Sequence, residues 1–135
     1  MKLLLKHMNI INPCNSFCVK DGGAKMEQDL LCGLANVLDK KIADDISILD
    51  ISNISPLADY FVIATGNTES HLDALREACD EYMHKNNHKT ISIEGLHHCE
   101  WVLIDYGNII VHLFSRDKRK YYDLDRIWRD AKKIN

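Results

Sequence analysis

The sequence predicts an α/β domain in which helices flank a mixed five-stranded sheet, in the order α-β-β-α-β-β-β-α. Two stretches, residues 26–42 and 68–85, space their apolar side chains three or four positions apart, as one buried face of a helix requires. Five short runs rich in Val, Ile and aromatic residues are typical of strands. The glycine of the Tyr106-Gly107-Asn108 turn predicts that the last two strands form a hairpin.

The composition limits the class of protein. The chain has 135 residues, 46% hydrophobic and 27% charged, with 17 Lys and Arg against 20 Asp and Glu. This length corresponds to one domain with a sizeable core, and such a hydrophobic content excludes intrinsic disorder. A formal charge of −3 gives no indication of bulk nucleic-acid binding. The apolar run Leu3-Leu4-Leu5 is far shorter than the roughly 20 residues of a membrane span, so we expect a cytoplasmic protein without a membrane partner.

Residues 1–25 differ from the rest of the chain. They carry four lysines against one acid, Asp21, and show no sustained helical or strand periodicity. Gly22-Gly23 lies just upstream of Met26 and can be encoded by GGAGG, the purine run of a bacterial ribosome-binding site. We therefore expect residues 26–135 to be the domain, and residues 1–25 to be a misassigned start or a short disordered extension.

The first helix is expected from Met26, and strands are expected at residues 46–51 and 60–64. Pro56 and small polar residues between these strands favour a loop. Thr68 or Ser70 can then cap a second helix, which ends at residues 86–87 and precedes a third strand at residues 90–94.

The hairpin comprises residues 101–105 and 109–114, and Asp123 is the expected N-cap of the last helix. A hairpin pairs its strands antiparallel, whereas a strand-helix-strand unit is parallel. The sheet is therefore expected to be mixed, with helices packed against it.

Two features resemble ligand-binding or catalytic motifs, and for each a structural role is favoured. Gly66-Asn67 lies at a strand-to-helix turn and could hold a phosphate, but the chain has no complete phosphate-loop motif. Asp123-Leu124-Asp125 has the D-x-D form used in two-metal phosphoryl transfer, yet acids at a helix start complement the helix dipole.

Histidines and cysteines do not form a recognisable metal site. His84 and His88 lie four residues apart and His97-His98-Cys99 are adjacent, but neither group has a second pair at zinc-site spacing. We therefore expect solvated histidines, no metal and no cofactor. The five cysteines are irregularly spaced and are expected to be free thiols, each buried as a small apolar side chain.

What remains is a surface built on the hairpin. By strand alternation Trp101, Leu103 and Asp105 share one face, and Tyr121-Tyr122 follows close behind in the sequence. Trp and Tyr are enriched at interface hot spots because they bury a large rigid area and keep a polar group. Two interpretations of Trp101 stay open, an interface anchor or a residue that packs beneath a helix.

Several long blocks follow one another in a fixed order: DISILDIS at residues 45–52, ADYFVIATGN at 58–67, Glu94-Gly95, WVLIDYGNIIVHLF at 101–114 and YYDL at 121–124. Together they resemble the ribosomal silencing factor (Iojap) family over about residues 27–132. Blocks of this length are far more specific than any short motif.

The resemblance implies a non-enzymatic factor that binds the large ribosomal subunit through ribosomal protein fourteen. By occupying the surface that faces the small subunit, such a factor blocks subunit joining and represses translation under nutrient limitation. The family resemblance also implies homodimers and a nucleotidyltransferase-like fold without catalytic acids. The alternative is a nucleotide-binding or nucleotidyltransferase-type enzyme.

Carried onto this sequence, the family's partner-binding surface consists of aromatic anchors with an acidic rim. Its residues are Trp101, Leu103, Asp105, Tyr106, Gly107, Tyr121, Tyr122, Glu94 and Glu100. Residues 26–135 hold 13 Lys and Arg against 19 Asp and Glu, a charge of −6. This acidity fits docking on a basic ribosomal protein, and no direct nucleic-acid binding is expected.

Overall fold

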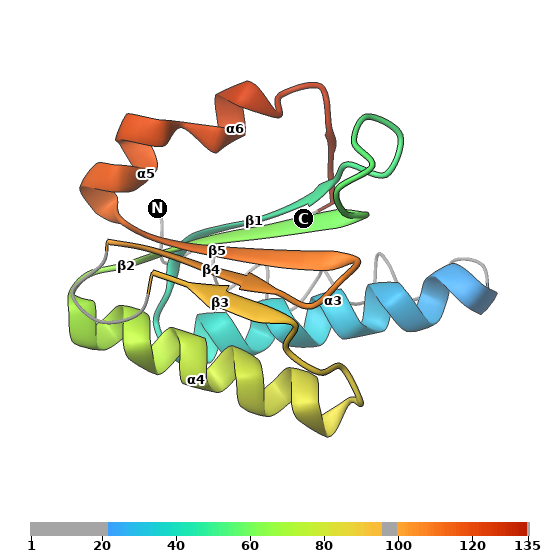
Figure 1. Ribbon diagram of the computed structural model, residues 1–135, viewed down its shortest axis with the longest axis horizontal. Helices are drawn as coiled ribbons and strands as arrows, with labels where there is room; N and C mark the ends of the chain where they lie inside the picture. Colours follow the sequence, from blue (N-terminus) through green and yellow to red (C-terminus); the bar gives the residue numbers. More distant parts are fainter. Residues whose placement is uncertain (1–21, 96–99, 135) are drawn as a thin grey trace.

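The computed structural model describes residues 22–95 and 100–134, and their elements stack in three layers (Figure 1). A six-stranded sheet occupies the middle, with helices α3 (Gly22–Lys40) and α4 (Glu69–Lys85) against one face. The shorter helices α5 (Arg116–Tyr122) and α6 (Leu124–Ile127) lie above the other face. Within the described part of the chain, no helix has the length and apolar character needed to cross a membrane.

The sheet is mixed, as predicted. Its strands, in chain order, are β1 (Asp44–Asp50), β2 (Tyr60–Gly66), β3 (Ser92–Glu94), β4 (Trp101–Asp105), β5 (Ile109–Ser115) and β6 (Lys132–Lys133). In space they follow the order β3-β4-β5-β2-β1-β6. Strands β2 and β5 pair in parallel, and the other four described pairs are antiparallel.

The parallel neighbour of β2 is the hairpin strand β5. The chain leaves β2 through α4 and enters the sheet again at the edge strand β3, so β3 runs in the same direction as β2 without touching it. The strand-helix-strand unit is therefore parallel, as predicted, but the β4–β5 hairpin lies between its two strands.

Two apolar clusters form the core, one on each face of the sheet. The larger cluster lies between the sheet and the helices α3 and α4, and it includes the fully buried Leu34, Leu75 and Val111. The smaller cluster is centred on Phe61, Ile63 and Phe114 under α5 and α6. The cap expected at Thr68 is confirmed, because its hydroxyl accepts a hydrogen bond from the amide of His71 at 3.0 Å.

The first helix begins earlier than predicted. Helix α3 begins at Gly22, so it extends across the boundary expected at Met26. Its added first turn contains Gly22 and Gly23, whose low helix propensity conceals a helix start in the sequence.

A last helix follows Asp123 in the N-cap position, as predicted, but this helix, α6, is a single turn and the Asp123 side chain makes no capping hydrogen bond to it. The sequence analysis missed a second helix, α5, directly before it. Helix α5 begins at Arg116 with Ser115 as its N-cap, and the Ser115 hydroxyl accepts a hydrogen bond from the amide of Lys118 at 3.2 Å. Asp123 has a φ of 48°, in the left-handed region, and separates α5 from the single turn of α6. Helix α5 has no buried residue, so hydrophobic periodicity cannot reveal it.

The predicted number of five strands is also wrong, because β6 adds a sixth. Lys133 of β6 pairs with Leu49 of β1, and Lys132 pairs with Asp50. Two lysines carry no apolar alternation, so this strand exists only because β1 offers a free edge for pairing. Of the other predicted strands, residues 90–94 shorten to Ser92–Glu94.

Candidate functional site

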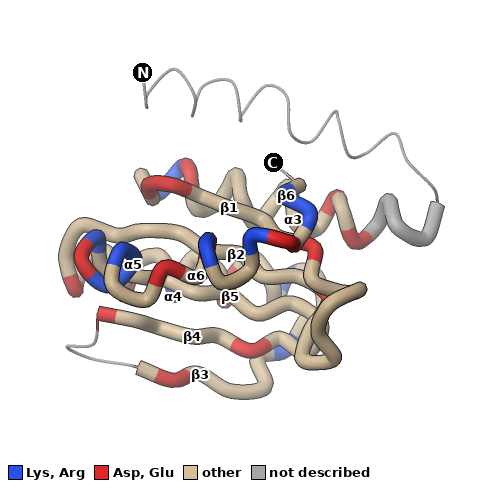
Figure 2. Tube along the Cα trace, turned by 90° about the horizontal axis from the view of Figure 1, so that it is seen from above, with Lys and Arg blue, Asp and Glu red and all other residues tan. Residues whose placement is uncertain are grey.

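The upper face of the sheet is only partly covered, and this leaves β3 and β4 accessible. Seen from above, α5 and α6 lie over the middle of the sheet, while β4 and β3 extend beyond them (Figure 2). Val102 and Ile104 point to the opposite face and are buried in the larger cluster. Trp101, Leu103 and Asp105 alternate with them and are half-buried on the upper face.

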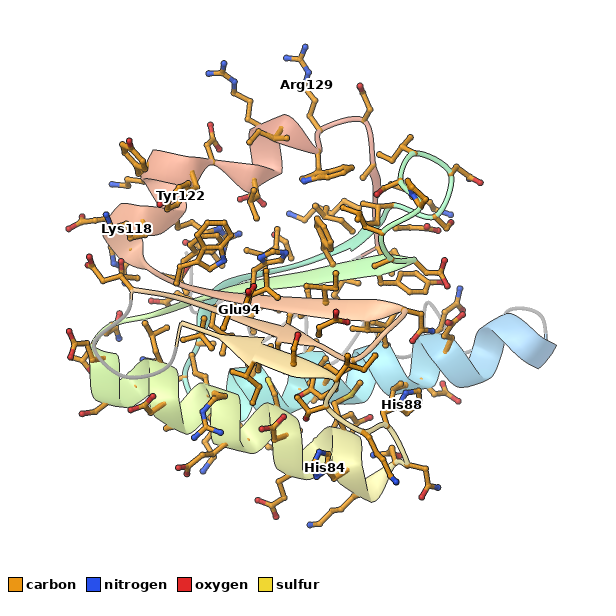
Figure 3. The ribbon with its side chains drawn as sticks, viewed as in Figure 1. His84, His88, Glu94, Lys118, Tyr122 and Arg129 are labelled. Carbon is orange, nitrogen blue, oxygen red and sulfur yellow. The ribbon has the colours of Figure 1, made fainter. Side chains whose placement is uncertain are left out.

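Trp101 belongs to an aromatic cluster. Its ring stacks on Phe114 of β5 with ring centroids 4.9 Å apart, and the centroid of Tyr122 of α5 lies 4.5 Å away. Tyr122 contacts Tyr121 edge-on at 5.0 Å, and the Lys118 ammonium lies 5.5 Å from the centroid of Tyr121. Figure 3 shows Lys118 and Tyr122 at the same end of the sheet. The α5 helix thus brings Tyr122 beside Trp101, with Tyr121 next to Tyr122, and Trp101 packs partly beneath this helix and stays partly exposed.

His112 of β5 fixes the orientation of Trp101. The indole Nε1–H of Trp101 donates to Nδ1 of His112 at 3.2 Å, and Phe61 contacts the imidazole edge-on at 4.7 Å. Burial lowers the pKa of His112 to about 4, so the ring is neutral near pH 7. Because Nδ1 accepts a hydrogen bond, the proton lies on Nε2, which is buried and has no partner among the described residues.

Acidic side chains border this half-buried surface. In β3, Glu94 lies opposite Leu103 and is exposed, and Ser92 lies opposite Asp105. Directly opposite residues of an antiparallel pair project to the same face, so Glu94 and Asp105 flank Leu103. Glu94 lies on the front strand of the sheet in Figure 3. Glu100 is exposed immediately before β4.

Two of the expected partner-binding residues lie elsewhere. Tyr106 is 5% exposed on the opposite face, where its hydroxyl donates to Oδ1 of Asp80 at 2.6 Å. Burial, followed by this hydrogen bond, raises the pKa of the Tyr106 phenol above its ordinary value. Gly107 forms the hairpin turn with a φ of 98°, and its amide donates to Oδ1 of Asp105 at 2.8 Å. The structure therefore gathers seven of the nine predicted residues on or beside the exposed face of β4. Gly107 is not among them, but its amide holds the side chain of Asp105, which is.

Arg119 is the residue that sequence reasoning missed. Its guanidinium donates to the carbonyl of Asp45 at 2.6 Å, to the Thr65 hydroxyl at 3.0 Å and to the Ser47 hydroxyl at 3.3 Å. It also forms an ion pair of 3.0 Å with Asp125, and its side chain is only 13% exposed. Arg119 thereby fastens α5 to β1, β2 and α6, which positions Tyr121 and Tyr122. One arginine in a charged run carries no sequence signal of this role.

The strand-to-helix turn at Gly66-Asn67 is occupied by the protein's own groups. The amide of Asn67 donates to Nδ1 of His71 at 2.9 Å, and the Asn67 side-chain oxygen accepts from Arg116 at 3.0 Å. A Cβ atom on Gly66 would lie 2.7 Å from Leu72, so this glycine is needed for close packing of α4. These contacts support a structural turn.

The other candidate motifs have structural partners. Asp125 of the D-x-D pattern binds Arg119, and Asp123 ends α5. His84 contacts the Thr90 hydroxyl at 3.1 Å, and Figure 3 shows His84 and His88 near the end of α4. Among residues 22–95 and 100–134, no three side chains of the metal-binding types gather into a site.

Two cysteines, Cys32 and Cys79, are buried, as predicted. Burial raises the pKa of the Cys79 thiol, which keeps it protonated. The remaining cysteines and the pair His97-His98 lie outside the described residues.

Curated relatives resemble this chain over most of its length. Ribosomal silencing factor RsfS of Bacillus subtilis is 36% identical over 105 residues, which cover 78% of this chain and 89% of the relative. The relative of the same name in Haemophilus influenzae is 30% identical, and the aligned residues cover 70% of this chain and 93% of the relative. A mouse protein named Mitochondrial assembly of ribosomal large subunit protein 1 is 30% identical, and the aligned residues cover 78% of this chain and 46% of the mouse protein.

Solved structures share the fold. A crystal structure of a Chromobacterium violaceum protein superposes with a TM-score of 0.71 at 28% identity, over 75% of this chain and 84% of that one. One from Bacillus halodurans gives a TM-score of 0.67 at 34% identity, over 75% and 94% of the two chains. The family model described as "Ribosomal silencing factor during starvation" matches residues 24–135. With this match and these relatives, the chain belongs to the ribosomal silencing factor family.

Proposed function

We propose that the protein binds the large ribosomal subunit through ribosomal protein fourteen, blocks joining of the two subunits and represses translation when nutrients are scarce. Membership of the ribosomal silencing factor family supports this proposal, and the mouse relative is named for assembly of the large subunit. The role is one of binding, and no step of it requires catalysis. In the same proposal the protein acts in the cytoplasm.

The observation that carries the proposal is the half-buried face of Trp101. Its indole is fixed from the protein side by Phe114, Tyr122 and His112, so little conformational entropy is lost when the exposed part is covered. Rigid aromatic side chains with a polar rim are typical of interface hot spots. Glu94 and Asp105 provide that rim next to Leu103.

The charge of this rim favours a basic partner. Glu94 and Glu100 are exposed and Asp105 is half-buried, and within the described residues no cation forms an ion pair with any of the three. A basic ribosomal protein would meet these carboxylates as it covers Trp101. A protein of this volume on the surface that faces the small subunit would prevent joining by steric exclusion.

Sedimentation of the purified protein with separated subunits, followed by a subunit-joining assay, tests the proposal. Trp101→Ala should weaken binding to the large subunit by about 2 kcal/mol or more, roughly 30-fold, and should restore joining. Leu57→Ala is a matched control, because Leu57 is 69% exposed in the loop between β1 and β2. Binding of wild-type protein to small subunits alone, or unchanged binding of Trp101→Ala, would refute the assignment.

A second variant separates binding from folding. Trp101→Ala removes contacts within the aromatic cluster, so its thermal unfolding must be measured alongside. Glu94→Lys changes an exposed side chain and should leave the fold intact while weakening the rim. If both variants fold and both bind like wild type, the β4 surface is not the interface.

The proposal extends to the fold type and the oligomeric state of the protein. We infer that the sheet belongs to the nucleotidyltransferase-like type without catalytic acids, and that the protein forms a homodimer. A titration with nucleoside triphosphates tests the alternative function directly, because measurable affinity or turnover would support an enzyme. Analytical ultracentrifugation, with and without large subunits, tests the dimer.

A further inference from the structure

Charge is distributed unevenly between the layers of the domain. Residues 116–133, which include α5, α6 and β6, carry eight Lys and Arg against four Asp, a charge of +4. Residues 26–115 carry five Lys and Arg against 15 Asp and Glu, a charge of −10. The charge of −6 for residues 26–135 therefore conceals a basic top on an acidic body.

Some of these cations are held by the protein itself. Arg119 is bound to Asp125, and Arg116 forms an ion pair of 2.8 Å with Asp44. Lys132 lies opposite Asp50 in the β1–β6 pairing. The two arginines neutralise part of the acidic body and are not available to a ligand, whereas Lys132 is exposed and forms no ion pair with a described residue.

The remaining cations form what we call the basic layer: Lys118, Lys120, Arg126, Arg129, Lys132 and Lys133. All are exposed except Lys118, which is half-buried, and none makes an ion pair with another described residue. Figure 2 shows basic stretches in α5, near α6 and at β6, and Figure 3 shows Arg129 directed away from the sheet. The layer thus presents unpaired cations to solvent over the top of the domain.

We propose that the basic layer contacts the phosphate backbone of RNA on the large ribosomal subunit, an inference that rests on the proposed function. Lysine and arginine bind phosphates without reading sequence. The acidic body repels phosphates, so within the described part of the chain this layer is the surface that can face RNA. Tyr121 is 76% exposed among these cations and offers an aromatic surface on which an unpaired base can stack.

The two surfaces can act in one docked position. Tyr122 of α5 contacts Trp101, so the basic layer borders the acidic rim around β4. The surface of a ribosomal subunit consists of basic protein set in RNA, and a bound factor meets both. The acidic rim then meets the protein while the basic layer meets the adjoining RNA, which orients the factor.

Binding of the full chain to a short fluorescent RNA duplex, measured by anisotropy between about 50 and 200 mM salt, tests this inference. The variant Lys120→Glu/Arg126→Glu/Arg129→Glu reverses three exposed charges of the basic layer. It should bind at least tenfold more weakly at the lowest salt, and the slope of log K against log salt should fall by about two. The matched control Lys40→Glu/Lys85→Glu/Lys89→Glu reverses three exposed charges of the acidic body and should bind like wild type.

Several results would overturn the inference. If the wild-type protein does not bind RNA at about 50 mM salt, the basic layer does not contact RNA. Equal weakening in both triple variants would assign the effect to net charge. Stronger competition by polyglutamate or by phosphatidylglycerol vesicles than by unlabelled RNA would assign the layer to an acidic protein or a membrane.

Trp101→Ala separates this inference from the proposed function. If the variant keeps RNA affinity and loses large-subunit binding, both stand. If it keeps both activities while the basic-layer variant loses RNA, the β4 interface fails and the RNA contact stands. If the basic-layer variant keeps RNA affinity, the RNA contact fails whatever Trp101→Ala does.

Discussion

Trp101 and His112 are joined across the β4–β5 pair by a hydrogen bond of 3.2 Å from the indole Nε1 to the imidazole Nδ1. The histidine is 4% exposed, whereas the tryptophan remains half-buried at the edge of the aromatic cluster. A buried residue therefore determines the orientation of the residue that we propose as the interface anchor. This bond requires neutral His112, because a protonated imidazole has no acceptor nitrogen.

Stability should depend on pH through His112. Its pKa is about 4 in the folded protein against 6.5 for an ordinary histidine, so the unfolded chain takes up the proton first as the pH falls. The stabilisation is complete above pH about 6.5 and is lost as the pH falls toward about 4, by up to about 3 kcal/mol. His112→Phe removes this titration, so its free energy of unfolding should fall less over the same range. Urea unfolding at a series of pH values measures the free energy of unfolding of the wild type and of His112→Phe. If both free energies fall equally with falling pH, the prediction is contradicted.

Arg119→Met should destabilise the protein by about 2 to 4 kcal/mol. The substitution keeps an apolar stem but removes the hydrogen bonds to Asp45, Thr65 and Ser47 and leaves Asp125 without its ion pair. The half-buried neighbour Lys118 makes no ion pair with a described residue, so Lys118→Met is the control and should cost less than about 0.5 kcal/mol. Equal stability of the two variants in denaturant unfolding would show that Arg119 does not hold α5.

Elements with an apolar pattern could be predicted from the sequence, and α5 could not. Strand β2 and the β4–β5 hairpin alternate or concentrate apolar residues, which the sheet buries directly. Helix α5 has no buried residue and is held by Arg119, which reaches Asp45 across 74 positions of sequence. A contact between such distant positions depends on the assembled sheet, and no local pattern records it.

Within the candidate site, strand alternation predicts the burial of Tyr106, a residue that the family resemblance assigns to the partner-binding surface. Alternation groups Tyr106 with Val102 and Ile104, and the structure buries all three on the face toward α3 and α4. His112 was detectable in principle, since it is the polar exception between the apolar residues Val111 and Leu113. Its hydrogen bond to Trp101 required the register of β4 on β5.

Two glycines of the β3–β5 region should differ in their tolerance of alanine. Gly107 and Gly95 both have positive φ values, 98° and 81°, which cost a non-glycine residue about 1 to 2 kcal/mol. A Cβ atom on Gly107 would meet only Ile91 at 3.4 Å, but on Gly95 it would lie 2.0 Å from the backbone oxygen of Trp101. Gly95→Ala should therefore lose more than about 3 kcal/mol, against about 1 to 2 kcal/mol for Gly107→Ala. Equal losses in urea unfolding would be inconsistent with the close approach of Gly95 to β4.

Tyr106 and Tyr121 should show opposite effects on stability and on binding. Tyr106→Phe removes the 2.6 Å hydrogen bond to Asp80 in the buried face, so it should lower the free energy of unfolding by about 1.5 to 3 kcal/mol. Because Tyr106 is only 5% exposed, the folded variant should bind large subunits like wild type. Tyr121→Ala changes a side chain that is 76% exposed, so it should leave stability within about 0.5 kcal/mol and weaken binding. Thermal unfolding and subunit sedimentation measure the two quantities for both variants. Loss of subunit binding by a stable Tyr106→Phe variant would move the interface to the opposite face of the sheet.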